Sequence, residues 1–211
     1  MTRSRSSRRS AESPADRRKQ ILRAAVETFA ERGFQRTRVS DIAKRAGVAY
    51  GLIYHYFENK DHVLDSLFAE NWGIFVKVLG DIEQDMETPA DERLYRVASL
   101  LIDALRIEPA LIQVIIQEIS RSDRFVQSTK FDAFQEAFAL VQRIIEQGQE
   151  RGELRSSFDS KVASLVFFGA LETLCTGFTL KVISCDNDEE AESLKRSVRE
   201  TLLKGMIAQH D

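Results

Sequence analysis

Proline and glycine are scarce in this sequence, which has three prolines and ten glycines in 211 residues. Both residues interrupt regular elements, so their scarcity favours long helices over a fold of strands and turns. Sustained alternation of apolar and polar residues is absent, and so are the turn dipeptides of a β-hairpin. The sequence therefore predicts an all-α protein of about nine helices.

Cysteine and histidine are equally rare, with two and three residues respectively. Cys175 and Cys185 lack the CxxC spacing of a metal or redox site, so we expect free thiols in a reducing cytoplasm. None of His55, His62 and His210 belongs to an HxxxH pair, and no serine or cysteine lies in a recognisable nucleophile motif. The sequence therefore predicts neither an enzyme nor a cofactor or metal site.

The sequence also lacks an uncharged apolar run long enough to span a membrane. The longest apolar stretch, residues 162–183, contains Glu172 and Lys181, which favours a helix buried in a bundle. The N-terminal arginines are not followed by the apolar segment that a signal peptide requires. We therefore expect a cytoplasmic protein without a membrane partner.

Charge is distributed unevenly along the chain. Residues 1–60 contain 14 Lys and Arg against 6 Asp and Glu, a balance of +8, and the remainder contains 16 against 27, a balance of −11. A basic head on an acidic body is typical of nucleic-acid binding, although an anionic membrane would attract the same charge. Residues 1–12 are rich in Ser and Arg, and we expect a disordered basic arm there, either without a role or lying along a DNA groove.

The helical pattern divides the rest of the chain into two domains. A small domain is expected over residues 13–58, beginning with a helix start at Ser13. A long helix capped by Asn59 then opens a larger domain over residues 59–211. Five more helices are expected in this domain, and the first begins at Thr88 with Pro89. The last two are expected from Ser157 or Asp159 to about Ser184 and from Asp186 to Gln209.

Residues 37–60 read T-R-V-S-D-I-A-K-R-A-G-V-A-Y-G-L-I-Y-H-Y-F-E-N-K and predict two short helices joined by a tight turn. Ser40 is expected to cap the first helix, and Gly47 to end it with a positive φ. In the second helix, Ile53 and Phe57 are four residues apart on the buried side. The remaining aromatic residues would waste their polar atoms in a core, so this face is expected to contact a partner. It comprises Tyr50, Leu52, Tyr54, His55 and Tyr56.

Together with the preceding Q-I-L-R-A-A-V-E-T-F-A-E-R-G-F-Q-R, this stretch resembles the DNA-binding head of the TetR family of bacterial transcriptional repressors. The resemblance covers residues 19–68 without a gap. It implies an all-helical homodimer with helix-turn-helix heads, a ligand pocket in each body, and dimer contacts through the last two long helices. It also implies binding to a double-stranded DNA operator, from which an effector releases the protein.

Carried over by position, the resemblance assigns residues 50–56 to the recognition helix. The residues that it implies near phosphates or base edges are Thr37, Arg38, Ser40, Tyr50, Gly51, Leu52, Tyr54, His55, Tyr56 and Lys60. Two positions depart from the family pattern, since Ala49 replaces a Ser or Thr cap and Leu52 replaces a polar residue. Losing the cap removes about 1 kcal/mol of helix stabilisation. Leu52 could pack on a thymine methyl but cannot hydrogen-bond a base.

In the body, E-Q-G-Q-E-R-G-E-L and F-F-G-A-L-E-T are similar to regulators of fatty-acid degradation within this family, which sense long-chain acyl-CoA. Ten of the thirteen phenylalanines lie after residue 60, enough to line a tunnel for an alkyl chain or simply to fill the core and dimer interface. The expected pocket residues are Leu101, Gln113, Gln117, Arg121, Phe131, Phe134, Phe138, Phe168 and Glu172. A CoA head would need basic groups at the pocket mouth, and the candidates are Arg106, Arg121 and Arg124.

Two alternatives stay open at this point. The protein could be an orphan or architectural DNA-binding regulator with a filled core, or a sensor of another hydrophobic or drug-like molecule. An apolar cavity beside Gln113, Gln117 or Glu172 would favour a sensor, whereas a solid core would favour the orphan regulator.

Overall fold

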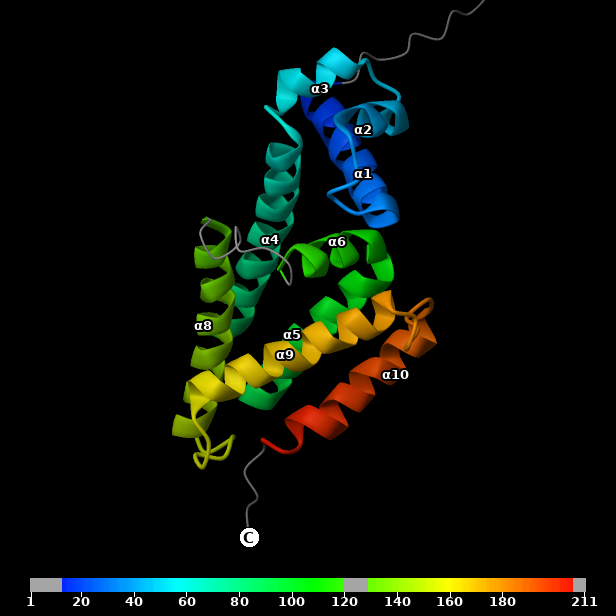
Figure 1. Ribbon diagram of the computed structural model, residues 1–211. Coiled ribbons are helices and arrows are strands. Elements are labelled where there is room, and N and C mark those ends of the chain that lie inside the picture. The colour runs from blue at the N-terminus through cyan, green and yellow to red at the C-terminus, as the bar shows by residue number, and fades with distance from the viewer. Residues whose placement is uncertain (1–12, 120–128, 207–211) are drawn as a thin grey trace, which may run out of the picture. The chain divides into compact units, whose positions relative to one another are not determined.

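The computed structural model describes residues 13–119 and 129–206, with side chains described at all of these positions except 118, 119 and 129–133. Within these ranges the regular elements are nine α-helices and one turn of π-helix (Figure 1). The predicted all-α class is therefore confirmed. The chain divides into two compact units, one ending at Leu67 and the other beginning at Phe68. This division falls inside a helix, whereas the prediction placed the boundary just before that helix.

The first unit contains the helices α1 (Pro14–Arg32), α2 (Val39–Ala46) and α3 (Tyr50–Tyr56). The predicted start of α1 is confirmed, because Ser13 Oγ accepts the backbone N–H of Asp16 at 3.1 Å. The predicted end of α2 is confirmed as well, because Gly47 has a φ of 66°, a left-handed conformation that glycine adopts without steric strain. Apolar side chains from all three helices form the core of the unit, including Ile21, Phe29, Ile42 and Ile53, and Phe57 joins them from the C-cap position of α3.

The start of α2 differs from the prediction. Arg38 rather than Ser40 is the N-cap residue, and Ser40 lies exposed in the first turn. Asp41 explains the earlier start: its Oδ2 accepts the backbone N–H of Arg38 at 2.9 Å, which holds the pKa of Asp41 below its usual value. A carboxylate three residues after the cap satisfies a backbone donor and complements the positive end of the helix dipole, so no serine cap is needed.

The helix α4 (Lys60–Gln84) begins in the first unit and continues into the second. Its predicted cap is confirmed, since Asn59 Oδ1 accepts the backbone N–H of His62 at 2.8 Å. The second unit continues with α5 (Ala90–Ile107), α6 (Pro109–Ile119), α8 (Thr129–Glu150), α9 (Ser160–Thr179), α10 (Asp188–Val198) and a π-helical turn (Arg199–Leu203) (Figure 1). Within this unit α5 is central, because it packs against α6, α8, α9 and α10.

Three boundaries in the second unit differ from the prediction. Pro89 rather than Thr88 precedes α5 as its N-cap residue, and Glu153 Oε2 accepts the backbone N–H of Ala90 at 2.7 Å, so the cap comes from a distant turn. The helix α9 ends at Thr179, before a turn in which Lys181 has a φ of 58°. The last helix starts at Asp188, two residues after its predicted start, and changes to π-helix at Arg199.

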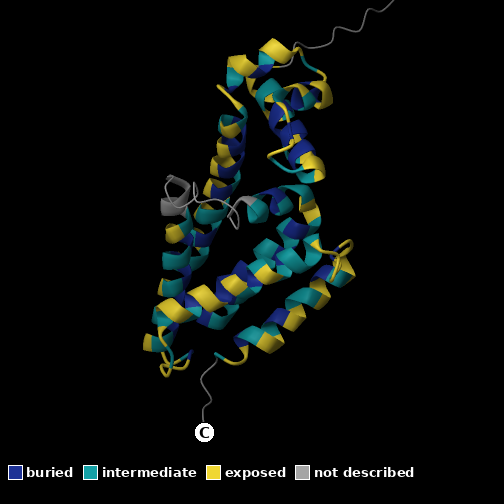
Figure 2. Cartoon of the chain, viewed as in Figure 1, coloured by how far each residue is buried: buried dark blue, intermediate teal, exposed yellow. Residues whose placement is uncertain are grey.

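Within the part of the chain that the structure describes, α9 is the one helix long and apolar enough to cross a membrane. Its apolar residues lie on two faces. Phe167, Phe168 and Leu171 are buried in the unit, whereas three others are more than half exposed. These exposed residues are Val162, Leu165 and Val166, and exposed positions recur along α9 in Figure 2.

Candidate effector pocket and DNA-binding surface

The helix α3 presents aromatic side chains on the surface of the first unit. Ile53 and Phe57 anchor it, each 1% exposed, whereas Tyr50 and Tyr54 are 53% and 46% exposed. The two tyrosine hydroxyls lie one helical turn apart and share a hydrogen bond of 2.9 Å. This hydrogen bond raises the pKa of the Tyr54 hydroxyl above its usual value. His55 is also exposed, which gives the face several hydrogen-bonding groups suited to phosphate and base edges.

The N-terminal end of α3 has no side-chain cap. Ala49 is its N-cap residue and has no side-chain oxygen to accept a backbone N–H, in agreement with the predicted loss of the cap. Gly51 is exposed and has no heavy atom within 4 Å of the position where a Cβ would stand. Leu52 is half-buried rather than fully outward. This end of the helix therefore leaves room for close approach of another molecule.

Two residues predicted near phosphates have structural contacts inside the unit. The side chain of Thr37 is buried, and its hydroxyl donates to the Gly33 carbonyl at 2.9 Å. The Lys60 ammonium donates to the Phe34 and Thr37 carbonyls at 2.7 and 3.0 Å and lies 4.3 Å from the centroid of the Phe34 ring. Because these contacts use most of its donors, Lys60 holds the turn between α1 and α2.

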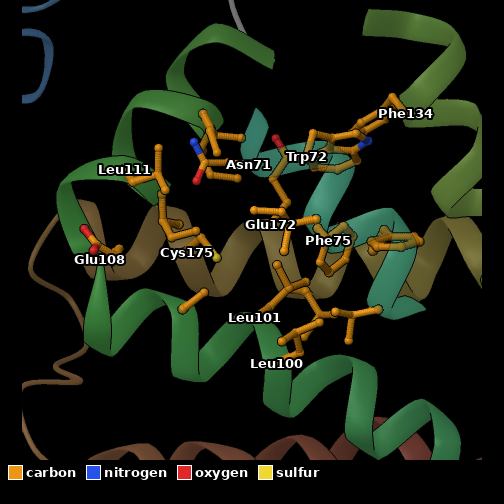
Figure 3. Close-up of a pocket in the computed structure, with 18 of the residues that line it drawn as sticks. Asn71, Trp72, Phe75, Leu100, Leu101, Glu108, Leu111, Phe134, Glu172 and Cys175 are labelled. Atoms are coloured by element: carbon orange, nitrogen blue, oxygen red, sulfur yellow. The ribbon is translucent and has the colours of Figure 1, made fainter. Parts of the chain in front are cut away.

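The second unit contains an apolar cavity of about 280 Å³ (Figure 3). An engineered apolar cavity of roughly 150 Å³ holds a benzene molecule, so this one has room for a longer apolar group. Five helices line it: α4, α5, α6, α8 and α9. The described residues therefore do not form the filled core that the orphan alternative requires.

A row of aromatic rings forms one wall of the cavity. Trp72 of α4 stacks on Phe134 of α8, with ring centroids 5.4 Å apart. Phe134 is followed by Phe138 at 4.8 Å, and Phe138 by Phe168 of α9 at 4.5 Å. Aliphatic residues of α5 and α6 form another wall, among them Leu101, Leu111 and Ile112.

Few polar groups reach the cavity. Asn71 of α4, Glu108 at the end of α5 and Glu172 of α9 contribute them, and the three side chains are visible in Figure 3. Cys175 lies beside Glu172 on the same helix, and burial together with the nearby carboxylate raises the pKa of its thiol to about 11. That thiol is protonated at neutral pH and is therefore a poor nucleophile. Among the described residues no group of three His, Cys, Asp or Glu could hold a metal ion.

The predicted pocket residues divide into three groups. Leu101, Phe134, Phe138, Phe168 and Glu172 line the cavity. Gln113 and Gln117 are half-buried on α6 but are not part of the lining, because the lining face of α6 runs through Leu111, Ile112, Ile115 and Ile116. Arg121 and Arg124 lie outside the described residues, and so does the side chain of Phe131.

The prediction missed the contribution of α4 to the cavity. Five residues of this helix line it: Asn71, Trp72, Ile74, Phe75 and Val78. One signal was available, since Asn71 is a polar residue within an apolar helical stripe, a pattern that suggests a polar contact inside a mostly apolar site. Arg106, proposed for a CoA head, instead pairs with Asp188 at 3.1 Å and does not line the cavity.

A helix-turn-helix unit with an exposed aromatic face, followed in the chain by a helical unit with an apolar cavity, defines the class of effector-responsive DNA-binding regulators. Two family models match the chain in succession. Residues 21–67 match bacterial regulatory proteins of the tetR family, and residues 68–205 match the C-terminal region of YsiA-like proteins. The chain belongs to the TetR family of bacterial transcriptional regulators.

Individual relatives are similar over almost the whole chain. The fatty acid metabolism regulator protein of Bacillus subtilis is 32% identical over 187 residues, which are 89% of this chain and 94% of the relative. The solved structure of FadR from Bacillus halodurans has a TM-score of 0.78 at 31% identity and covers 93% of this chain and 98% of its own. FadR from Bacillus subtilis, solved in complex with stearoyl-CoA, has a TM-score of 0.75 at 32% identity, with coverages of 89% and 98%.

Proposed function

We propose that this protein is a repressor of fatty-acid degradation genes, released from its operator when a long-chain acyl-CoA enters the cavity of the second unit. The observation that carries the proposal is the apolar cavity itself, which is lined in part by α4. The same helix begins beside the helix-turn-helix motif at Lys60. A ligand in the cavity therefore contacts the element that continues into the DNA-binding unit.

The lining favours the acyl chain as the part of the ligand that enters. Its walls are aliphatic and aromatic, which suits a hydrocarbon chain. The carboxylates of Glu108 and Glu172 would repel the phosphates of CoA. The nucleotide end is therefore expected outside the cavity, and the candidates from the sequence for its phosphates remain Arg106, Arg121 and Arg124.

For DNA binding we propose that α3 enters the major groove. The exposed hydroxyls of Tyr50 and Tyr54 are placed to donate to phosphates, and Gly51 permits close approach of the backbone. Arg38 and Ser40 are exposed at the start of α2 and are proposed as further contacts. Their proximity to α3 in the sequence fits the helix-turn-helix arrangement, in which the first helix crosses the backbone.

We propose a homodimer that forms through α9 and α10. The support is the exposed row of Val162, Leu165 and Val166 on a helix whose other face is buried in the unit. A contiguous apolar surface of this kind marks an interface, and a second copy of the chain would cover it. Two heads held by this dimer would then contact half-sites about one helical turn apart.

Stearoyl-CoA tests the proposed effector directly. At a concentration about 100 times its Kd, a ligand stabilises the folded state by about 2.7 kcal/mol. For a protein of this size the expected rise in melting temperature is about 5–10 °C. Operator affinity, measured by fluorescence anisotropy, should fall in the same concentration range, and CoA alone should change neither quantity.

If stearoyl-CoA changes neither the melting temperature nor the operator affinity, the acyl-CoA proposal is wrong. Mass spectrometry of compounds that copurify with the protein would then identify the molecule that occupies the cavity. A hydrophobic or drug-like compound found there would assign the protein to the alternative class of sensor.

A further inference from the structure

The guanidinium of Arg93 is buried at the C-terminal end of α4. This residue lies in the first turn of α5 and is 0% exposed. Its Nη1 donates to the backbone carbonyl of Glu83, in the last turn of α4, at 2.9 Å, and to Oε1 of Gln147 on α8 at 2.6 Å. One buried cation thus joins three helices of the second unit.

Further hydrogen bonds converge on the same end of α4. Gln147 Nε2 donates to Glu83 Oε1 at 2.9 Å, and Arg143 Nε lies 3.4 Å from the same oxygen. Beyond the helix, Arg151 Nη1 donates to the Met86 carbonyl at 2.7 Å. We call Glu83, Arg93 and Gln147 the α4 anchor. Both α5 and α8 therefore hold this end of the helix by directional contacts.

The anchor is poorly explained by stability alone. Among the described residues, Nε and Nη2 of Arg93 have no hydrogen-bond partner, although both atoms are buried. Burial lowers the pKa of Arg93, which reflects the unfavourable removal of its charge from water. Packed apolar residues often replace buried charges without loss of stability. A charged residue at this position is better explained by the positional constraint that its hydrogen bonds impose.

The stretch of α4 that lines the cavity presents apolar side chains to a ligand. Trp72, Phe75 and Val78 are among them, and the ring centroids of Trp72 and Phe75 lie 5.2 Å apart. A ligand would meet this stretch through apolar contacts, which have no directional requirement. The helix therefore has one end fixed by hydrogen bonds and a middle that contacts the ligand. We propose that Arg93 is a positioning residue, which fixes the far end of α4 so that a ligand in the cavity displaces the part of the helix nearer the DNA-binding unit.

This inference depends on the proposed function, because it concerns how the effector signal reaches the operator. The test is Arg93→Met, which keeps an unbranched side chain and removes every donor. The measured quantity is the coupling factor, the ratio of operator Kd with saturating stearoyl-CoA to operator Kd without it. We expect Arg93→Met to lower this factor about tenfold, while the Kd for stearoyl-CoA in the absence of DNA, followed by Trp72 fluorescence, changes less than about threefold.

Lys195→Met is the matched control. Lys195 is also largely buried, with 11% of its side chain exposed, and its ammonium pairs with Asp103 on α5 at 2.7 Å and with Glu192 at 2.8 Å. The pair with Asp103 joins α10 to α5, the pair with Glu192 lies within α10, and neither involves α4. We therefore expect this variant to have a lower melting temperature but the coupling factor of the wild type.

The possible outcomes separate the two proposals. A wild-type protein that keeps its operator at saturating stearoyl-CoA overturns the proposed function and the role of Arg93 with it. A wild type that releases its operator, together with an Arg93→Met variant of equal coupling factor, overturns the role of Arg93 alone. If Arg93→Met does not fold, Gln147→Met removes one side of the α4 anchor and is judged by the same ratio, where an unchanged factor again contradicts the inference.

Discussion

The helix ends of the first unit and the cavity of the second are formed by different kinds of contact. In the first unit, Ser13, Asp41 and Asn59 satisfy backbone donors at helix ends, and Lys60 holds three carbonyls of one turn. In the second unit, hydrogen bonds fix the α4 anchor, whereas mostly apolar side chains from five helices line a cavity of about 280 Å³. Hydrogen bonds define one geometry, whereas apolar surfaces tolerate several. This difference suits a fixed recognition surface and an adaptable pocket.

The largest effect is expected when one buried aromatic ring is removed from each unit. Phe29 is 1% exposed in the first unit and Phe167 is 0% exposed in the second. We expect Phe29→Ala and Phe167→Ala each to lower the free energy of unfolding of its own unit by about 3–5 kcal/mol. Urea unfolding is followed by far-UV circular dichroism, which reports both units, and by fluorescence of Trp72, which reports the second.

The two variants serve as controls for each other. If the units unfold separately, Phe29→Ala shifts part of the circular dichroism transition and leaves the Trp72 transition unchanged. Coincident shifts in both signals would mean that the units unfold as one cooperative structure. The contrast between them would then concern local contacts rather than independent stability.

A smaller effect is expected from Lys60→Met, which keeps the length of the side chain and removes its ammonium. The Phe34 and Thr37 carbonyls lose a charged donor, so the stability of the first unit should fall by about 1–3 kcal/mol. The salt dependence of operator binding distinguishes this role from a phosphate contact. Loss of a phosphate contact lowers the slope of log K against log salt concentration by about 0.9.

Lys44→Met is the control for the change in charge, because Lys44 is exposed on α2. It should leave the urea midpoint of the first unit unchanged. If Lys60→Met leaves both the urea midpoint and the salt slope at wild-type values, then Lys60 neither stabilises the turn nor contacts DNA. The hydrogen bonds of Lys60 would then contribute nothing to the stability of the first unit.

The smallest expected effect comes from Tyr54→Phe, which removes a single hydroxyl from the face of α3. We expect operator affinity to fall about two- to tenfold, as for the loss of one hydrogen bond. The melting temperature should not change, because the side chain is 46% exposed. Tyr95→Phe makes the same chemical change in the second unit and should leave operator affinity unaltered. If Tyr54→Phe and the wild type bind the operator with equal affinity, the Tyr54 hydroxyl does not contact DNA.

Local sequence patterns were sufficient for the helices and most of their ends. The caps at Ser13 and Asn59 and the turn at Gly47 depend on neighbouring residues, so they could be predicted without the fold. The start of α2 was predicted wrongly, because Asp41 competes with Ser40 as a local acceptor. The cap of α5 depends on Glu153, which is 63 residues away from Ala90 and gives no local signal.

The residues that line the cavity could also be predicted only in part. Phenylalanines at helical spacing indicated an apolar site, and Phe134, Phe138 and Phe168 do line the cavity. Gln113 and Gln117 were wrongly included in the lining, and the residues of α4 were missed. Whether a side chain faces a cavity or a neighbouring helix depends on the rotation of each helix within the packed unit, which periodicity alone does not specify.

The helical class, the basic head, the exposed aromatic face of α3 and the apolar character of the second unit could be predicted, because these features depend on composition and short-range spacing. Which residues meet across long separations in the chain is known from the folded structure alone. This structure brings Lys60 to the carbonyls of Phe34 and Thr37, encloses a cavity between five helices, and buries Arg93 against the end of α4. Such contacts arise when separate elements pack, and their energies depend on geometry that residue types alone do not specify.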